Sequence, residues 1–130
     1  MSQTTKQRTG SWGEQQAALF LTNLGYNILE RNYKINGGKE GELDIVAIHK
    51  KDFLGETLCF VEVKTRGQKD GSAERATRGN KINKFMKAGR AYCLEQDINI
   101  DSTPIQFEQV SVYKGEDGSV EIKHYEIPVG

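Results

Sequence analysis

Two acidic residues lie where a sequence of this kind usually has apolar ones, and they are the first candidates for chemistry. Asp44 interrupts the apolar run 42–49, and Glu62 interrupts the apolar run 58–65. Burying a carboxylate without a partner costs several kcal/mol, on the order of 2–7 for a polar group, so each acid needs a counterpart. Lys64, two residues after Glu62, is the nearest basic residue within the same runs.

Both runs are apolar on both faces, which predicts central strands of a sheet covered above and below. The segment between them is short, polar and contains Gly55, so the two strands should form an antiparallel hairpin. With the centre of the hairpin near residues 53–54, and with both acids on one face, Asp44 stands opposite Glu62 or Lys64.

Carboxylates that face one another repel, and a divalent cation would turn them into a site. Mg²⁺ is typically held by one or two carboxylates, waters and substrate phosphates. Lys64 would then place an ammonium group beside the attacking water or the attacked phosphate. An ordinary charge network of Asp44, Lys64 and Glu62 explains the same residues, because buried ion pairs also occur without function. The two interpretations stay open on chemistry alone.

Glu14 is the third acidic candidate, and it has a local explanation. With Ser11 it fits a capping box, which predicts that a helix begins here. It also lies on the side of the helix expected to pack, so it could reach the sheet. His49 and His124 are not expected to be ligands or bases, because neither has an acidic or histidine companion at ligand spacing. The sequence holds no nucleophile elbow, Walker loop, dinucleotide fingerprint or zinc pattern.

The surrounding pattern predicts one α/β domain over 11–130, after a frayed, disordered N-terminus over 1–10. Apolar residues at helical spacing end at Gly25, and a second helical pattern follows Asn80. The expected elements, in the order αβββαββ, are a helix over 12–24, strands over 27–35, 42–49 and 58–65, a helix over 80–96, and a hairpin of strands over 106–113 and 119–127.

The chain has 130 residues with equal numbers of acidic and basic side chains, 18 of each, yet the charge is segregated. Residues 60–90 carry nine basic against three acidic side chains, and residues 91–130 carry two against eight. A local positive field of this kind suits a polyanion such as nucleic acid. The plain alternative is a solvated helix face followed by a loop. The residues expected to contact a phosphate backbone are Arg66, Arg75, Arg78, Lys81 and Lys84.

Other classes of protein are disfavoured. No apolar run is long enough to cross a membrane, and no secretory signal precedes the helix, so a cytoplasmic location is expected. Cys59 and Cys93 lie in apolar contexts without metal spacing, which predicts reduced thiols in the core.

Several short motifs together resemble the YraN-like (UPF0102) family. They are Gly13-Glu-Gln, Arg31-Asn-Tyr33, Gly41-Glu-Leu-Asp44, Phe60-Val-Glu-Val-Lys-Thr-Arg66 and the helix that holds Lys81 and Lys84. The resemblance spans roughly residues 10–127. This family of small bacterial proteins is similar to the PD-(D/E)xK nuclease superfamily and, within it, to archaeal Holliday-junction resolvases. Leu43 stands where the name of the superfamily has proline.

The resemblance implies a restriction-endonuclease-like core, a mixed sheet flanked by helices. It implies that Asp44 and Glu62 bind Mg²⁺ or Mn²⁺, with the backbone carbonyl of Val63 as third ligand. Lys64 would orient or polarise the attacking water. Glu14 would complete the acidic cluster.

The leading hypothesis is therefore a Mg²⁺-dependent, structure-selective DNA endonuclease, whose basic segment contacts the backbone and so carries little sequence information. A second hypothesis is a nucleic-acid-binding module of nuclease architecture that does not cut. A third is a protein-interaction domain whose acidic segment 95–126 contacts a basic partner. A homodimer would suit the cutting of two strands, and the edge of the hairpin 106–127 offers a surface for one.

Overall fold

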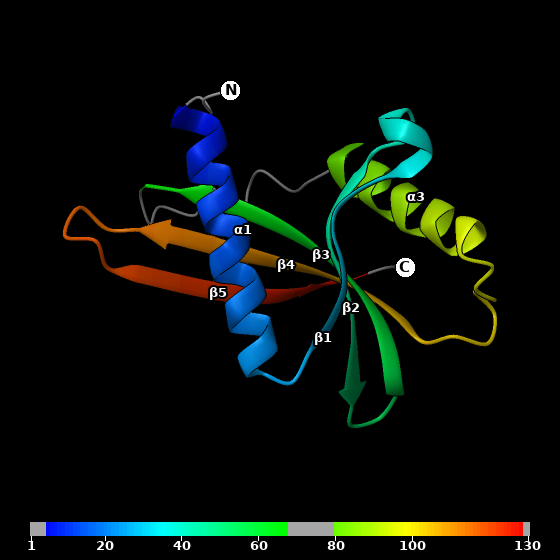
Figure 1. Cartoon of the computed structure of the whole chain (residues 1–130). Coiled ribbons are helices and arrows are strands. Elements are labelled where there is room, and N and C mark those ends of the chain that lie inside the picture. The colour runs from blue at the N-terminus through cyan, green and yellow to red at the C-terminus, as the bar shows by residue number, and fades with distance from the viewer. Residues whose placement is uncertain (1–4, 68–79, 129–130) are drawn as a thin grey trace.

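The computed structural model describes residues 5–67 and 80–128 (Figure 1). Its central element is a five-stranded sheet with the strand order β1-β2-β3-β4-β5. The elements are α1 (Thr5–Asn23), β1 (Asn27–Lys34), a short 3₁₀ turn (Ile35–Gly38), β2 (Glu42–Lys51), β3 (Gly55–Arg66), α3 (Asn80–Glu95), β4 (Ile105–Lys114) and β5 (Val120–Ile127).

The sheet is mixed, as predicted. β3 and β4 run parallel, whereas every other neighbouring pair in the sheet is antiparallel. A parallel pair needs a long crossover connection, and α3 lies in the connection between β3 and β4. The α/β class and the order αβββαββ are therefore confirmed, and the expected hairpins 42–65 and 106–127 are both present.

The two helices cover opposite faces of the sheet (Figure 1). On β3, Cys59, Val61 and Val63 pack in the cluster that contains Ala17 and Leu21 of α1. The alternate residues Leu58 and Phe60 pack in the cluster that contains Phe85 and Tyr92 of α3. This alternation follows from the period of two along a strand, and it explains why the run 58–65 is apolar on both faces.

Helix α1 begins earlier than predicted. The structure is helical from Thr5, so residues 5–10 are not the frayed end that their polar composition suggested. Ser11 and Glu14 lie inside the helix, and the predicted capping box at its start is wrong. The local pattern of Ser and Glu three residues apart fits a helix surface as well as a helix end, which is why it misled.

The end of α1 matches the prediction and follows from glycine chemistry. Gly25 has φ of +94°, a left-handed conformation that costs a glycine little. The N–H of Tyr26 donates to the carbonyl of Leu21, and the N–H of Gly25 donates to that of Thr22. These two bonds form a Schellman motif, which ends the helix and turns the chain into β1.

The cysteines are placed as predicted. Cys59 and Cys93 are both buried and free, as core thiols should be. In the described part of the chain, no helix is long and apolar enough to span a membrane.

Candidate acidic site between α1, β2 and β3

The register of the β2–β3 hairpin places the two strand acids together. The last paired residues are Ile45 and Val61, so one further step puts Asp44 opposite Glu62. Asp44 was expected to lie opposite Glu62 or Lys64, and in the structure it lies opposite Glu62. The ladder does not continue through this step, because the N–H of Val63 donates to Asp44 Oδ2 at 2.8 Å.

Glu62 and Lys64 form an ion pair on the same strand. The Nζ–Oε1 distance is 2.9 Å, and each side chain is about one-fifth exposed, at 21% and 20%. Both alternate with Phe60, so they point to the face of the sheet that α3 covers. This pair is partly open to solvent and can therefore meet a ligand.

Glu14 on helix α1 is near enough to the strand acids for their charges to affect one another. The helix comes very close to β3 at Gly13, where an added Cβ would lie 1.8 Å from Thr65 Oγ1. Burial raises the pKa of Glu14, and the nearby carboxylates of Glu42 and Glu62 raise it further. A hydrogen bond from the Asn32 side chain and the charge of Arg31 act in the opposite direction.

Asp44 is the carboxylate most affected by this arrangement. Burial and the facing carboxylate of Glu62 raise its pKa to about 7, and Glu14 adds to the rise. The N–H of Val63 and the charge of Lys64 lower the pKa but do not compensate. Glu14, Glu62 and Lys64 thus all act on Asp44, and the cluster has an excess of negative charge.

Of the three predicted acids, Glu62 lines a cleft of about 230 Å³, whereas Glu14 and Asp44 are not part of its lining. One side of the cleft is formed by Glu62 and Lys64 on β3 together with Glu42 at the start of β2. The other side is formed by α3, which contributes the exposed lysines Lys81 and Lys84. Carboxylates that suit a cation therefore share one cleft with ammonium groups that suit a phosphate.

The structure describes three of the five residues that were predicted to contact nucleic acid. Lys81 and Lys84 lie at the cleft, as described. Arg66 is exposed at the end of β3, where its guanidinium donates to the Thr65 carbonyl at 2.8 Å. Arg75 and Arg78 lie outside the described residues, so their role stays a prediction.

The donor chemistry fits a hard divalent cation, whereas the arrangement of the side chains is not that of a ready site. Asp44, Glu62 and Glu14 supply oxygen ligands, and a cation would offset the repulsion that raises the pKa of Asp44. Among the described residues, however, no three acidic, histidine or cysteine side chains are placed so that they could hold a metal ion together. One oxygen of the Glu62 carboxylate, Oε1, is already paired with Lys64. The role of the Val63 carbonyl stays a prediction.

Sequence reasoning missed three members of this region. Glu42 lines the cleft and acts on Glu14, and Arg31 and Asn32 act on Glu14 from β1. Glu42 had a signal, because it lies two residues before Asp44 on the same strand. Asn32 lies in the Arg31-Asn-Tyr33 motif, but its place beside the acids depends on how β1 pairs with β2.

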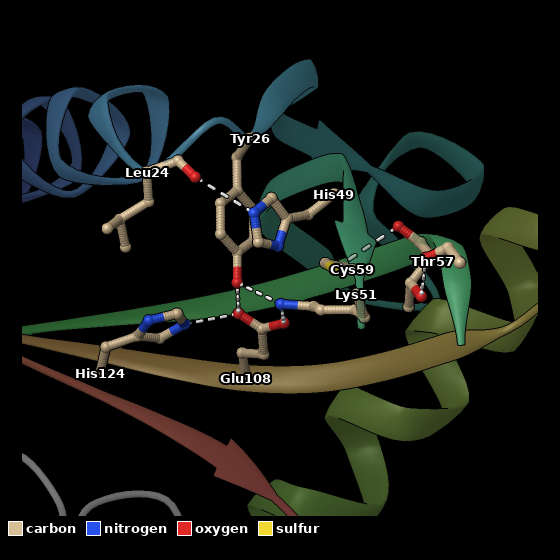
Figure 2. A network of polar contacts seen from close by, with 9 residues as sticks. Leu24, Tyr26, His49, Lys51, Thr57, Cys59, Glu108 and His124 are labelled. Atoms are coloured by element: carbon tan, nitrogen blue, oxygen red, sulfur yellow. Dashed lines mark hydrogen bonds and ion pairs between the residues drawn. The ribbon is translucent and has the colours of Figure 1, made fainter. Parts of the chain in front are cut away.

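A second polar cluster lies on the α1 face, and Figure 2 shows its side chains pointing toward one carboxylate. Glu108 is only 1% exposed and is contacted from β2, from β5 and from the turn between α1 and β1. Its Oε1 accepts a hydrogen bond from the Tyr26 hydroxyl at 2.7 Å and lies 2.5 Å from Nε2 of His124. Its Oε2 lies 3.2 Å from Nζ of Lys51. The ring of His49 stacks on Tyr26 with centroids 4.0 Å apart.

This cluster, which we call the Glu108 network, corrects two expectations. His124 does have an acidic companion, although the companion is distant in sequence. Glu108 belongs to the acidic segment 95–126 that the third hypothesis expected to contact a basic partner, yet its side chain is buried and so is not part of such a surface. Its partners hold it as an anion: burial alone raises its pKa, but the hydrogen bonds from His124 and Tyr26 and the charge of Lys51 lower it to about 2.

Comparison with known proteins gives consistent matches over most of the chain. The family described as "Uncharacterised protein family UPF0102" matches residues 13–112. A UPF0102 protein of Desulforamulus reducens is 38% identical over 117 residues, which cover 88% of this chain and 89% of that protein. A UPF0102 protein of Syntrophomonas wolfei is 40% identical over 121 residues, which cover 88% and 91%. UPF0102 protein Franean1_1156 of Parafrankia sp. is 38% identical over 119 residues, which cover 91% and 92%.

Proposed function

The chain belongs to the UPF0102 family, whose description states no activity, and we propose that it is a divalent-metal-dependent hydrolase of DNA phosphodiesters. The observation that carries the proposal is the shared cleft, where Glu42, Glu62 and Lys64 face Lys81 and Lys84. A phosphodiester needs both kinds of group, because its charge must be held while a water is activated beside it.

Each side chain has a part in this proposal. Asp44, Glu62 and Glu14 would hold Mg²⁺ or Mn²⁺, and the cation would supply Lewis-acid stabilisation of charge on the phosphate. The N–H of Val63 keeps Asp44 in place through Oδ2 and leaves its other oxygen to the ligand. Lys64 is paired with Glu62, and it would orient the attacking water once Glu62 turns toward the cation.

Lys81 and Lys84 would bind the phosphate backbone on the far side of the cleft. Contacts of this kind do not read bases, so they fit selection by DNA structure, such as a branch, better than selection by sequence. Binding should therefore weaken steeply with salt. An affinity that does not change between 50 and 200 mM salt would contradict this part of the proposal.

The decisive experiment is cleavage of a labelled panel of four-way junction, flap, single-stranded and linear duplex DNA in Mg²⁺ or Mn²⁺. We expect cutting by the wild type and a loss of at least about 100-fold for Asp44→Asn, since removing a ligand or transition-state contact typically costs 10²–10³. Asp52→Asn is the matched control, because Asp52 is exposed in the turn between β2 and β3. Equal cutting by wild type and Asp44→Asn would point to a contaminant and overturn the proposal.

A second candidate is a binding module that uses the same cleft without cutting. It is favoured by the finding that no three potential ligand side chains among the described residues are placed to hold a metal. In that case Asp44→Asn should bind DNA as well as the wild type does, with or without Mg²⁺, and neither protein should cut.

A further inference from the structure

The turn between β2 and β3 carries the most exposed large apolar side chain of the described residues. Phe53 is 100% exposed, and Leu54 beside it is 52% exposed. The turn projects beyond the rest of the sheet (Figure 1). Single exposed apolar residues are common, but an aromatic side chain that lies wholly in water next to a second large apolar one is typical of a surface that a partner covers.

An apolar groove lies beside the same hairpin, on the face of the sheet that α3 covers. Its volume is about 430 Å³. β1, the β2–β3 hairpin and the connection between α3 and β4 all contribute to it, and its apolar lining consists of Leu29, Ile48, Leu58, Ile98 and Pro104. Phe53 cannot occupy the groove of its own chain, because its side chain is fully exposed.

A protruding apolar pair and an apolar groove on one surface complement each other between two copies of the chain. In a two-fold dimer the same patch of each copy contributes, so the turn of one copy fills the groove of the other and the reverse. One interface would therefore cover both features. A partner of another kind would have to supply a knob and a groove of its own.

The charges around the groove suit the same arrangement. Lys50 and Glu56 lie directly opposite one another on the two strands that flank the turn, and both are exposed. Glu56 also lines the groove. Within the part of the chain that the structure describes, neither side chain forms an ion pair. When the turn of one copy enters the groove of the other, Lys50 of the first can face Glu56 of the second, and such complementary charges fix the register of an interface.

We propose that Phe53, Leu54 and the groove form the interface of a two-fold homodimer. A standard interface buries about 800 Å² per partner, and a phenylalanine supplies about 150–250 Å² of it. Leu54, the groove and its charged rim supply the rest. This surface is separate from the edge of β5.

The acidic cleft stays open in this dimer. Glu42 lines the cleft at the first residue of β2, whereas the turn follows the last residue, Lys51. Ten residues of strand at about 3.3 Å each separate the two ends by roughly 30 Å. The proposal is therefore independent of the proposed function, and neither fails with the other.

The first test is sedimentation velocity of the full chain from about 1 μM to about 300 μM. We expect the wild type to pass from monomer to dimer within this range. Phe53→Ser should weaken the dimer at least about 30-fold, because a central aromatic anchor is a typical hot spot. The matched control is Val120→Ser, which also removes an exposed apolar side chain but lies at the other end of the sheet, where β5 pairs with Lys114.

The second test reverses the charges at the rim. Lys50→Glu and Glu56→Lys should each weaken the dimer, because like charges then meet across the interface. A mixture of the two variants should form a heterodimer, because each contact across the interface again joins opposite charges. A variant that merely failed to fold could not be rescued in this way.

Three results would overturn the proposal. One is a wild type that stays monomeric over the whole range, which would leave the turn and the groove to a different protein. Another is an equal effect of Phe53→Ser and Val120→Ser on the dimer. The third is a mixture of the charge variants that associates no better than either variant alone.

Discussion

Asp44 and Glu108 both carry carboxylates with little solvent exposure in the same sheet, and their surroundings shift their pKa values in opposite directions. The pKa of Asp44 is raised to about 7, whereas that of Glu108 is lowered to about 2. Burial disfavours the charged form of both. The difference comes from the neighbours, because Asp44 meets two other carboxylates while Glu108 meets Tyr26, Lys51 and His124.

Glu108 is surrounded by groups that stabilise its negative charge, whereas Asp44 is surrounded mainly by groups that destabilise it. Tyr26 donates a hydrogen bond to Glu108, Nε2 of His124 lies beside the same oxygen, and Lys51 forms an ion pair with the other oxygen, which is buried and has no hydrogen-bond partner. Asp44 has one N–H and a lysine shared with Glu62. An excess of negative charge beside a cleft is typical of a site that awaits a ligand, although structural clusters also shift pKa values.

The largest expected change in stability concerns Glu108. Glu108→Gln should lower the free energy of unfolding by about 3–5 kcal/mol, because it leaves Lys51 and its neighbours without their buried counter-charge. Urea unfolding followed by circular dichroism measures this change. Glu116→Gln, in an exposed turn, is the control. A midpoint for Glu108→Gln that matches the wild type would mean that the network contributes no net stability.

A smaller loss of stability is expected at Gly13, where α1 comes close to β3. Gly13→Ala should destabilise by about 1–3 kcal/mol, because the added methyl group would collide with Thr65. Gly10→Ala is the matched control on the same helix, since a methyl group there meets nothing within 4 Å. It should stabilise the helix by up to about 1 kcal/mol. If both changes act alike in thermal unfolding, the close approach of α1 to β3 is not a constraint.

The smallest expected change in the free energy of unfolding is a gain rather than a loss, and it concerns Asp44. Because its folded pKa is raised, the metal-free folded state binds more protons than the unfolded chain between about pH 4 and pH 7. Wild-type stability should therefore rise as pH falls from 8 to 5. Asp44→Asn lacks this dependence, and at pH 8 it should be more stable than the wild type, because a neutral amide is not repelled by the carboxylate of Glu62.

Urea titrations at pH 8, 6.5 and 5 without metal measure the Asp44 effect. Glu108→Gln is the contrasting variant. Because the folded pKa of Glu108 is lowered, its carboxylate stabilises the wild type above about pH 4.5, and this stabilisation is lost only as pH falls toward 2. An Asp44→Asn protein that is less stable than the wild type at pH 8 would show that Asp44 is as well compensated as Glu108.

Much of the fold could be predicted because its signals are local. The apolar runs around Asp44 and Glu62 are continuous, and the short polar segment between them leaves little choice but a hairpin. Gly25 ends α1 through its own conformation. The same local reasoning failed at Ser11, because a pattern of two residues cannot show whether a helix continues before it.

The parts that could not be predicted depend on contacts between distant segments. Asp44 and Glu62 lie in one hairpin, so a register argument reduces their pairing to two choices. Glu108 and Tyr26 are 82 residues apart, and nothing near either residue announces the other. Asn32 lies opposite Asp44 only because β1 pairs with β2 at one particular register.

The position of the C-terminal hairpin has a consequence for how the protein is made. Synthesis delivers β1, β2 and β3 first, and until β4 arrives the edge of β3 is open, a surface on which strands of other chains can pair. The hairpin of β4 and β5 closes that edge and at the same time brings Glu108 and His124 to Tyr26 and Lys51. The same C-terminal hairpin therefore covers the edge of β3 and completes the buried charge network.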